Sequence, residues 1–444
     1  MVIILALLGA LTAAPARADA AGTYDAALAA VKGVDDAKIR EAEGKELDAL
    51  LARPADAAFL ADPRVAALLG PNQPAVELFR AATNAPNDGY LLAPKVETYN
   101  SKTPIPQLFK HLKLVKLLLL DAKLAAAKAK PRRVESDLLA AVGFMVQVSE
   151  QKSGALISAL VEQLAFEKAY APLSDSARGR TASPAYLKEL SARLDLLARN
   201  QDFMRAAFLE EAERGKGSLR EGITPESVAK GRDKLPFIKR LVAEKYQDAE
   251  YVAMVVAQLE AATDARTQAI VSSFRANDHA PLADYQKKLD EELLAHKTER
   301  EALGLWAQFQ DGLSGGKNAK RVMADATADI LLRIAAPDYS KLIPRCHAFL
   351  SELSVLRAGL AVELYARERK RPPDNLAQLV PAYLPAVPQD SFNRFSPLRY
   401  VPSGKKFFVY GFGPDGKDHG GVALDLDAFM SDGSRDVGDF VYRD

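Results

Sequence analysis

Helical spacing of apolar residues, with prolines at the starts of segments, is the feature that most limits how this chain can fold. Between residues 103 and 173 this spacing predicts three successive helices, over 106–129, 131–151 and 155–171. A proline opens each of the first two, at a helix position where its missing N–H costs nothing. The connections are short, so neighbouring helices are expected to pack antiparallel.

Such helices predict either an irregular helical bundle or an array of helical hairpins. An array of the tetratricopeptide type would carry a Trp/Gly/Tyr/Pro pattern at a strict period of about 34 residues, and the sequence lacks that pattern. The irregular bundle is therefore the preferred interpretation of the N-terminal region.

Composition divides the chain beyond its first 20 residues into three parts. A first helical part is predicted over 21–173 and a second over 174–344, and the second begins with a polar linker at 174–183. The C-terminal part, 345–444, is predicted to be a small α+β domain in which a short antiparallel sheet packs on a helix over 345–369. The fold class is thus mainly α. Helices of the second part are predicted from 184, and at 202–214, 236–259, 281–310 and 319–335.

The first 20 residues predict a secretory signal peptide. Residues 1–14 carry no charged side chain, Pro15 follows, and the small residues after it fit the pattern of signal peptidase, with cleavage after Ala18 or Ala20. The apolar stretch is too short for a spanning helix, which takes about 20 residues. We therefore expect an exported protein, periplasmic or extracellular, without a membrane span after cleavage. A weak N-terminal anchor is the alternative if the segment is retained.

Charge and cysteine content exclude several classes of protein. Lys and Arg number 59 against 58 Asp and Glu, a net charge of +1, whereas dedicated nucleic-acid binders carry a clear basic excess. We therefore expect no nucleic-acid partner. The single cysteine, Cys346, excludes both an intramolecular disulfide framework and a zinc site built from cysteines.

Residue combinations typical of catalysis are not recognisable. The five histidines include no pair at i, i+4 spacing that could bind zinc. Cys346 and His347 are adjacent, and adjacent side chains on a helix point about 100° apart, so they cannot serve each other as nucleophile and base. Glu162 and Glu167 face different sides of a helix and make no carboxylate pair for glycoside hydrolysis. These patterns predict a protein that is not an enzyme.

Aspartate and glycine dominate the C-terminal stretch. An aromatic strand at 407–412 enters a loop of small residues and carboxylates, and a second short strand ends the chain; from Arg369 onward there are ten Asp and no Glu. Short carboxylates in glycine-rich turns suit a hard cation such as calcium, but Asp and Gly also favour turns without any metal. The spacing after Asp415 does not match an EF-hand, so a calcium site here would have to be discontinuous.

The stretch from Leu353 to Asp444 resembles the C-terminal domain of the major pseudopilin of type II secretion systems. The matching pieces come in the family's order. A helix ends in LYARERKRPP at 364–373, and the pieces that follow are LAQLV at 376–380, LPAVPQDSF at 384–392, PLRY at 397–400, YGFGPDGK at 410–417 and Asp436-Val437. The resemblance implies a helix that serves as a stem on which a small sheet packs.

The same resemblance implies a calcium ion that fixes the loop between the last strands. It assigns the calcium ligands to the Phe412 carbonyl, Asp415 and Asp436, with Asp432 and Asp439 as substitutes. The chain departs from the family in two ways. The loop at 416–435 is longer, and the sequence carries neither the N-terminal methylation signal nor the long apolar assembly helix. We therefore expect a fusion that contains the domain and not a pilus subunit.

Together these features predict an exported, non-enzymatic scaffold or interaction protein with a calcium-stabilised C-terminal domain and a protein partner in the cell envelope or the secretion machinery. Two alternatives are an envelope enzyme whose site lies between helices, and a peptide-binding helical solenoid. A deep polar cleft with converging carboxylates would favour the enzyme. A concave groove formed by three or more stacked hairpins would favour the solenoid.

Overall fold

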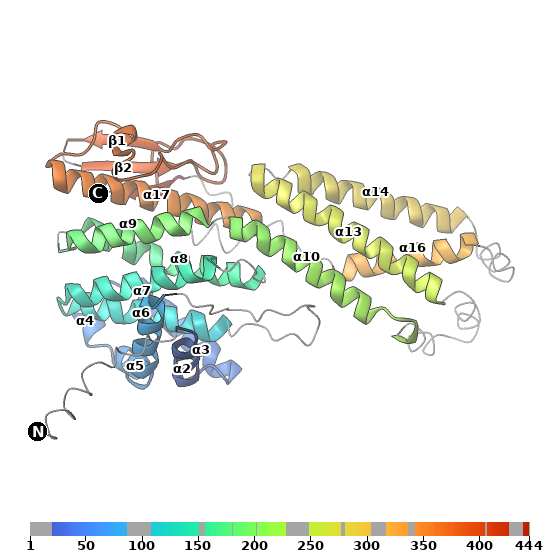
Figure 1. Ribbon diagram of the computed structural model, residues 1–444, viewed down its shortest axis with the longest axis horizontal. Coiled ribbons are helices and arrows are strands. Elements are labelled where there is room, and N and C mark those ends of the chain that lie inside the picture. Colours follow the sequence, from blue (N-terminus) through green and yellow to red (C-terminus); the bar gives the residue numbers. More distant parts are fainter. Residues whose placement is uncertain are drawn as a thin grey trace, which may run out of the picture.

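The computed structural model is mainly helical, with a small three-stranded antiparallel sheet near the C-terminus, which confirms the predicted fold class. Figure 1 shows a body of stacked helical layers under the sheet, and a helical arm that extends to one side. The residues that the structure describes are 20–86, 108–150, 156–179, 181–200, 202–227, 248–276, 280–302, 317–335, 342–404, 406–425 and 438–443.

Almost all of the predicted signal peptide, 1–20, lies outside the described residues; Ala20 alone is described, as the first residue of a helix. None of the helices within the described ranges is long and apolar enough to cross a bilayer.

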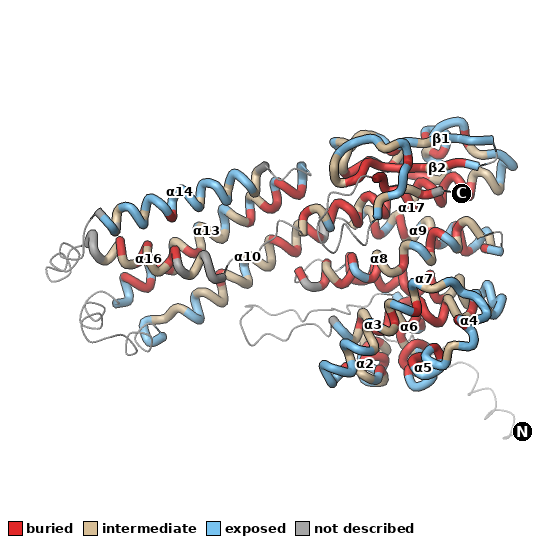
Figure 2. Tube along the Cα trace, turned by 180° about the vertical axis from the view of Figure 1, so that it is seen from behind, coloured by how far each residue is buried: buried red, intermediate tan, exposed pale blue. Residues whose placement is uncertain are grey.

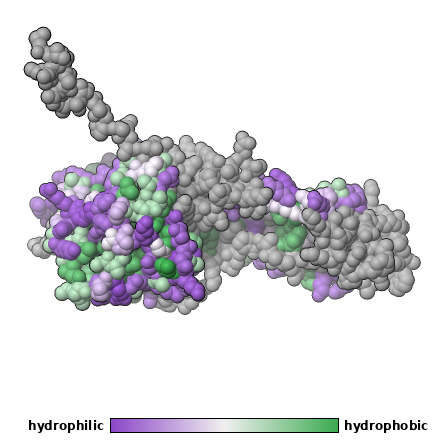
Figure 3. Space-filling model, turned by 90° about the horizontal axis from the view of Figure 1, so that it is seen from below, coloured by the Kyte–Doolittle hydropathy of each residue, from purple (hydrophilic) through white to green (hydrophobic). Residues whose placement is uncertain are grey.

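Four helices form the N-terminal layer of the body: α2 (Ala20–Ala30), α3 (Ala37–Ala52), α4 (Ala57–Leu60) and α5 (Pro63–Asn84). An aspartate side chain caps the start of each of the last three, as N-cap residues commonly do. α5 continues through two internal prolines, because its buried face packs along α2 and this packing outweighs the lost backbone hydrogen bonds. Seen from below, hydrophilic and apolar side chains are interspersed over this side of the body (Figure 3).

Two helical hairpins follow. α6 (Leu108–Ala127) and α7 (Pro131–Ser149) form the first, and α8 (Leu156–Arg178) and α9 (Pro184–Arg199) the second. α6 packs on α8 and α7 packs on α9, so that equivalent helices lie above one another. α5 covers one side of this stack, and α17 (Leu342–Arg369) covers the other. The region therefore contains two stacked helical hairpins covered by further helices, within the mainly helical class that the sequence predicted.

The prediction of a polar linker over 174–183 is wrong for its first half, because α8 continues to Arg178. Leu173 and Ala177 are fully buried and extend the apolar face of the helix past its internal proline. The boundary expected between the two helical parts, at 173 and 174, therefore falls inside a helix.

A single hydrophobic core runs from Tyr24 in α2 to Tyr442 near the C-terminus, so the helical body and the C-terminal sheet are packed as one unit.

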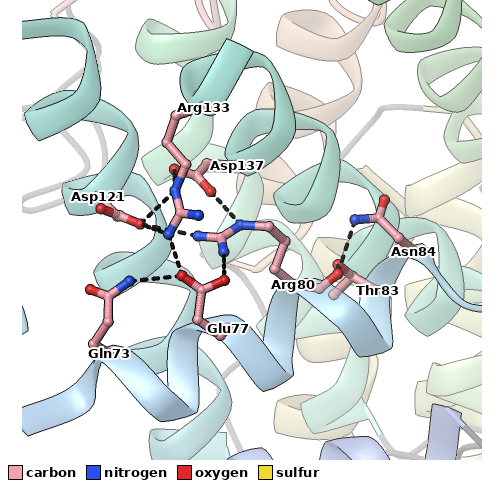
Figure 4. A network of polar contacts seen from close by, with 8 residues as sticks. All are labelled: Gln73, Glu77, Arg80, Thr83, Asn84, Asp121, Arg133 and Asp137. Atoms are coloured by element: carbon pink, nitrogen blue, oxygen red, sulfur yellow. Dashed lines mark hydrogen bonds and ion pairs between the residues drawn. The ribbon is translucent and has the colours of Figure 1, made fainter. Parts of the chain in front are cut away.

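An ion network joins α5 to α6 and α7 (Figure 4). Arg80 of α5 lies at its centre, with Nε donating to Asp137 at 2.6 Å and Nη2 to Asp121 at 3.0 Å. Arg133 of α7 donates to Asp121 and to Glu77, both at 2.6 Å. Arg80 is 7% exposed and Asp137 is 0% exposed. Buried charges of this kind are tolerated only because each guanidinium offers five donors to the surrounding carboxylates.

The arm consists of α10 (Asp202–Gly222), α13 (Ala249–Ala276), α14 (Ala280–Ala302) and α16 (Lys317–Ala335). α13 packs against each of the other three, and the arm has a small core of its own around Tyr251 and Leu259. Contacts of α10 with α8 and of α13 with α17 join the arm to the body. At this junction the buried imidazole of His347 on α17 lies 2.8 Å, through Nε2, from the backbone carbonyl of Phe274 on α13.

α17 is the central element of the body. Its 28 residues contact α8, α9, α13, the short 3-10 helix η1 (Leu376–Leu379) and the sheet, and Figure 2 shows buried positions along most of its length. The sheet has the order β1 (Arg399–Ser403), β2 (Lys406–Gly411), β3 (Phe440–Arg443), with both pairs antiparallel. β2 and β3 pack directly on α17. The predicted arrangement of a helix beneath a short sheet is therefore present.

Candidate functional site

The loop after β2 brings two of the predicted aspartates to one histidine. The ring Nε2 of His419 lies 2.9 Å from Oδ2 of Asp415, and the backbone N–H of Lys417 donates to the other oxygen of that carboxylate at 3.1 Å. Asp439 accepts the backbone N–H of His419 at 3.1 Å and that of Gly421 at 2.8 Å. Asp415 and Asp439 thus both contact His419, Asp415 at the ring and Asp439 at the backbone N–H.

Backbone contacts fix this convergence. The N–H of Asp439 donates to the carbonyl of Val422 at 2.6 Å, and the N–H of Leu424 donates to the carbonyl of Asp439 at 2.9 Å. Gly413 lies so close to the carbonyl of Gly438 that any Cβ at position 413 would overlap it. The start of the loop and the residue before Asp439 therefore touch, and this contact requires glycine.

The third described member of the predicted ligand set, Phe412, is held by a residue that the sequence did not single out. The backbone N–H of Phe412 donates to Asp390 at 2.8 Å, and the N–H of Phe392 donates to the other oxygen of Asp390 at 2.9 Å. Asp390 is fully buried. Its position just before a turn was the available signal, since Asp side chains accept hydrogen bonds from backbone N–H groups two residues ahead.

The carboxylates of this site differ in their electrostatic surroundings. Burial raises the pKa of Asp390, although three backbone N–H groups oppose the shift, and the nearby charge of Asp439 adds to it. Burial likewise raises the pKa of Asp439, against the effect of the N–H groups of Gly421 and His419. For Asp415 burial acts in the same direction, but the hydrogen bonds from His419 and Lys417 outweigh it and hold the pKa below its usual value.

These contacts bear on whether the residues fit calcium. Both oxygens of Asp415 and the carboxylate of Asp439 are already occupied by imidazole or N–H groups, an arrangement typical of a hydrogen-bonded turn. In the described ranges no group of three His, Cys, Asp or Glu side chains is placed to hold a metal ion. Asp432 and Asp436 lie in 426–437, outside the described residues. The described residues alone therefore do not make a calcium site, and the predicted site depends on these two aspartates.

A second group of ionisable residues lies buried between α8 and α17. Burial raises the pKa of Glu162 well above its ordinary value, and burial together with the charge of Glu167 does the same for Glu352. Burial also raises the pKa of the Cys346 thiol to about 12, so it is not a thiolate at neutral pH. The sequence missed this cluster because its members come from helices far apart in the chain.

A cavity of about 400 Å³ lies inside the arm, between α10, α13, α14 and α16. The enzyme alternative requires carboxylates that converge in a polar cleft, but Glu211 is the one carboxylate among the residues that line this cavity.

The solenoid alternative requires an open groove over three or more hairpins, whereas the stack of α6–α7 and α8–α9 is covered by α5 and α17.

Comparison with known proteins adds no relative: no family model, no curated protein and no solved structure matches the chain. The resemblance of 353–444 to the pseudopilin domain therefore stays a prediction.

Proposed function

We propose that this chain is an exported scaffold protein whose helical body presents the small C-terminal sheet to a protein partner in the cell envelope. The position of α17 carries the proposal. One helix packs on β2 and β3 and also on α8, α9 and α13, so the sheet is attached to both the hairpin stack and the arm. A domain held in this way keeps a fixed orientation toward a partner.

The outer strand of the sheet supports a binding role. β1 has β2 as its neighbour on one side and lies at the edge of the sheet, and most of its residues are exposed. Two of the large exposed apolar side chains, Val401 and Val422, also belong to this domain. Edge strands and exposed apolar residues are surfaces that partner chains commonly use.

The order of elements supports the pseudopilin-like part of the proposal. A stem helix, a 3-10 turn, an antiparallel pair and a long loop before a last strand follow one another in the order that the resemblance implies. We include in the proposal that the protein works beside secretion components and that calcium stiffens the loop through the Phe412 carbonyl, Asp415 and Asp436, with Asp432 and Asp439 as substitutes.

Site-specific photocrosslinking in cells tests the scaffold role. A photoreactive amino acid replaces Val401, which is 36% exposed on the sheet, and Leu60, which is 41% exposed at the end of α4, serves as the control. We expect one discrete crosslinked protein from position 401 and not from position 60. The same product from both positions, or none from 401, would contradict the proposal. N-terminal sequencing of the mature protein checks export, with Asp19 or Ala21 expected as the first residue.

Calcium is tested separately by thermal unfolding with and without the ion. The wild type and the surface variant Asp374→Ala are expected to gain melting temperature with calcium, whereas Asp415→Ala and Asp436→Ala are expected to lose that gain. The readout is the calcium-dependent increment, because Asp415→Ala also removes the contact with His419. A wild type that does not respond to calcium removes the metal from the proposal and leaves the scaffold role in place.

A further inference from the structure

The cavity inside the arm has a mainly apolar wall. Its volume of about 400 Å³ falls within the range typical of ligand pockets, about 300–1,000 Å³. Phe208, Leu259 and Ile270 line it and are buried. Four leucines that also line it are only partly buried, so they present apolar surface that an occupant would remove from water: Leu219, Leu289, Leu331 and Leu332.

Small residues on α10 account for the space. Ala212, Gly215 and Ser218 follow one another at helical spacing and all line the cavity, at positions where a packed helix would present larger side chains. Within the described residues, a Cβ atom at Gly215 would have no neighbour closer than 4 Å beyond the backbone of its own helix. α10 therefore lines the cavity here without filling it.

Three hydroxyl groups on the wall are turned toward the protein backbone. Thr263 and Thr267 of α13 donate to carbonyls of their own helix, each at 2.7 Å. The hydroxyl of Tyr285 on α14 donates to the carbonyl of Ala262 at 3.1 Å. The protons of these hydroxyls are therefore already used, and the parts of the side chains that remain for an occupant are methyl groups and a ring.

Charged residues of both signs also line the cavity, Glu211 from α10 and Arg266 from α13. The Glu211 side chain is 36% exposed and Arg266 is half-buried, so both keep contact with water. An anion in the cavity would share it with Glu211, and a cation would share it with Arg266. Either ion would also lose hydration against an apolar wall, which costs free energy. The lining therefore suits a neutral molecule.

We infer that the arm binds a neutral, mainly apolar small molecule, of the class of medium-chain alcohols and uncharged aromatic compounds, in the cavity between α10, α13, α14 and α16. The body of the molecule lies against Phe208, Leu259 and Ile270, and the space over Gly215 receives it. This binding does not involve the C-terminal sheet and goes beyond the scaffold role.

Fluorescence titration with the neutral dye N-phenylnaphthylamine tests the inference on the full chain, because the dye brightens in apolar surroundings. We expect saturable binding and displacement of the dye by decanol. Decanoate and decylammonium have the same chain length and are used below their micelle concentrations. Each should need a concentration about tenfold or more higher than decanol, because each brings a charge to an apolar wall.

Absence of saturable dye binding would overturn the inference. So would displacement by decanoate or decylammonium at the same concentration as decanol, since a neutral ligand would then not be preferred. This comparison uses only the wild-type protein and does not depend on any variant folding.

Two variants then place the dye. Gly215→Leu puts a branched side chain into the cavity and is expected to weaken dye binding about tenfold or more. Gly222→Leu is its matched control, since Gly222 is on the same helix, has open space around its Cβ position and does not line the cavity. Leucine favours a helix more than glycine does, so Gly215→Leu should melt no lower than the wild type. Wild-type affinity in Gly215→Leu, or an equal loss in Gly222→Leu, would show that the dye binds elsewhere and would overturn the inference.

Discussion

The ring of Tyr442 in β3 lies directly on the backbone of Gly359 in α17. A Cβ atom at position 359 would overlap three carbons of that ring. Tyr442 is fully buried and stacks on Phe407 of β2, with ring centroids 6.0 Å apart. A glycine inside a long helix costs helix stability, so its presence here is explained by the close approach of the sheet to its stem.

Replacing Gly359 with alanine should therefore destabilise the protein. We expect a loss of about 1–3 kcal/mol in the free energy of unfolding, because the ring and the sheet must shift to admit one methyl group. Gly44 of α3 is the matched control, since its Cβ position is open among the described residues. Gly44→Ala should be neutral or stabilising by up to about 1 kcal/mol. Urea unfolding measures both, and equal effects would show that Gly359 does not have this role.

Because Arg80 lies at the centre of an ion network, removing its charge should lower the free energy of unfolding strongly. Arg80→Met leaves Asp121 and Asp137 without their central guanidinium, and we expect a loss of about 3–5 kcal/mol. The control is Lys45→Met, which removes an exposed pair with Glu41 whose side chains are 76% and 69% exposed. That change should stay within about 0.5 kcal/mol. A loss below about 1 kcal/mol for Arg80→Met would mean that Arg133 alone can hold the carboxylates.

Because burial raises the pKa values of Glu162 and Glu352, the free energy of unfolding should depend on pH. A carboxyl group whose pKa is raised in the folded protein holds its proton more strongly there than in the unfolded chain. Its contribution to the free energy of unfolding is fully present below the ordinary value of 4.5 and is lost as pH rises through the raised pKa. The wild type should therefore lose stability as pH rises from 5 to 8.

Glutamine at both positions should reduce this loss, since the side chain keeps its shape and cannot ionise. The double variant Glu162→Gln with Glu352→Gln should show a shallower decline in the free energy of unfolding over that pH range, as measured by urea unfolding at each pH. Glu189→Gln changes an exposed carboxylate on α9 and should leave the slope as it is. An unchanged slope in the double variant would count against a raised pKa at either position.

Asp415 and Asp439, which both contact His419, should differ in how much they stabilise the loop. Asp439 is 1% exposed and accepts two backbone N–H groups, whereas Asp415 contacts the imidazole and one N–H. Asp439→Ala should speed hydrogen exchange of the Gly421 and His419 amides and cost about 1–3 kcal/mol, because it leaves buried donors without an acceptor. Asp415→Ala should affect these amides less. Equal exchange in both variants would contradict this ranking.

The helices were largely predictable because their signals are local. Proline at the first position and a capping serine predicted the start of α9 at 184, and the apolar spacing predicted α7 and α16 within a few residues. The predicted helix ends were wrong where contacts with distant segments decide them. α8 runs on past Pro172 because its buried face continues, and α13 extends to Ala276 where the sequence suggested an end near 259.

The C-terminal site was predicted only in part. Asp415 and Asp439 were named from composition and resemblance, but the sequence assigned no role to His419, whose ring contacts Asp415 and whose backbone N–H donates to Asp439. Asp390 lies in the piece at 384–392 that resembles the pseudopilin domain, and the resemblance gives it no role, yet its carboxylate accepts the backbone N–H of Phe412. Both roles depend on residues that the turn or the sheet brings together, and the sequence contains no direct signal for such pairs.

The sequence by itself determined the helical class, most helix starts and a short sheet with an aspartate-rich loop, because capping, proline geometry and side-chain periodicity act within a few residues. Only the tertiary structure decided that the sheet shares a core with the hairpin stack, that Arg80 joins three helices, and that α10 leaves a cavity over Gly215. These features arise from contacts between segments distant in the chain, where packing and desolvation, and not local preference, set the free energy.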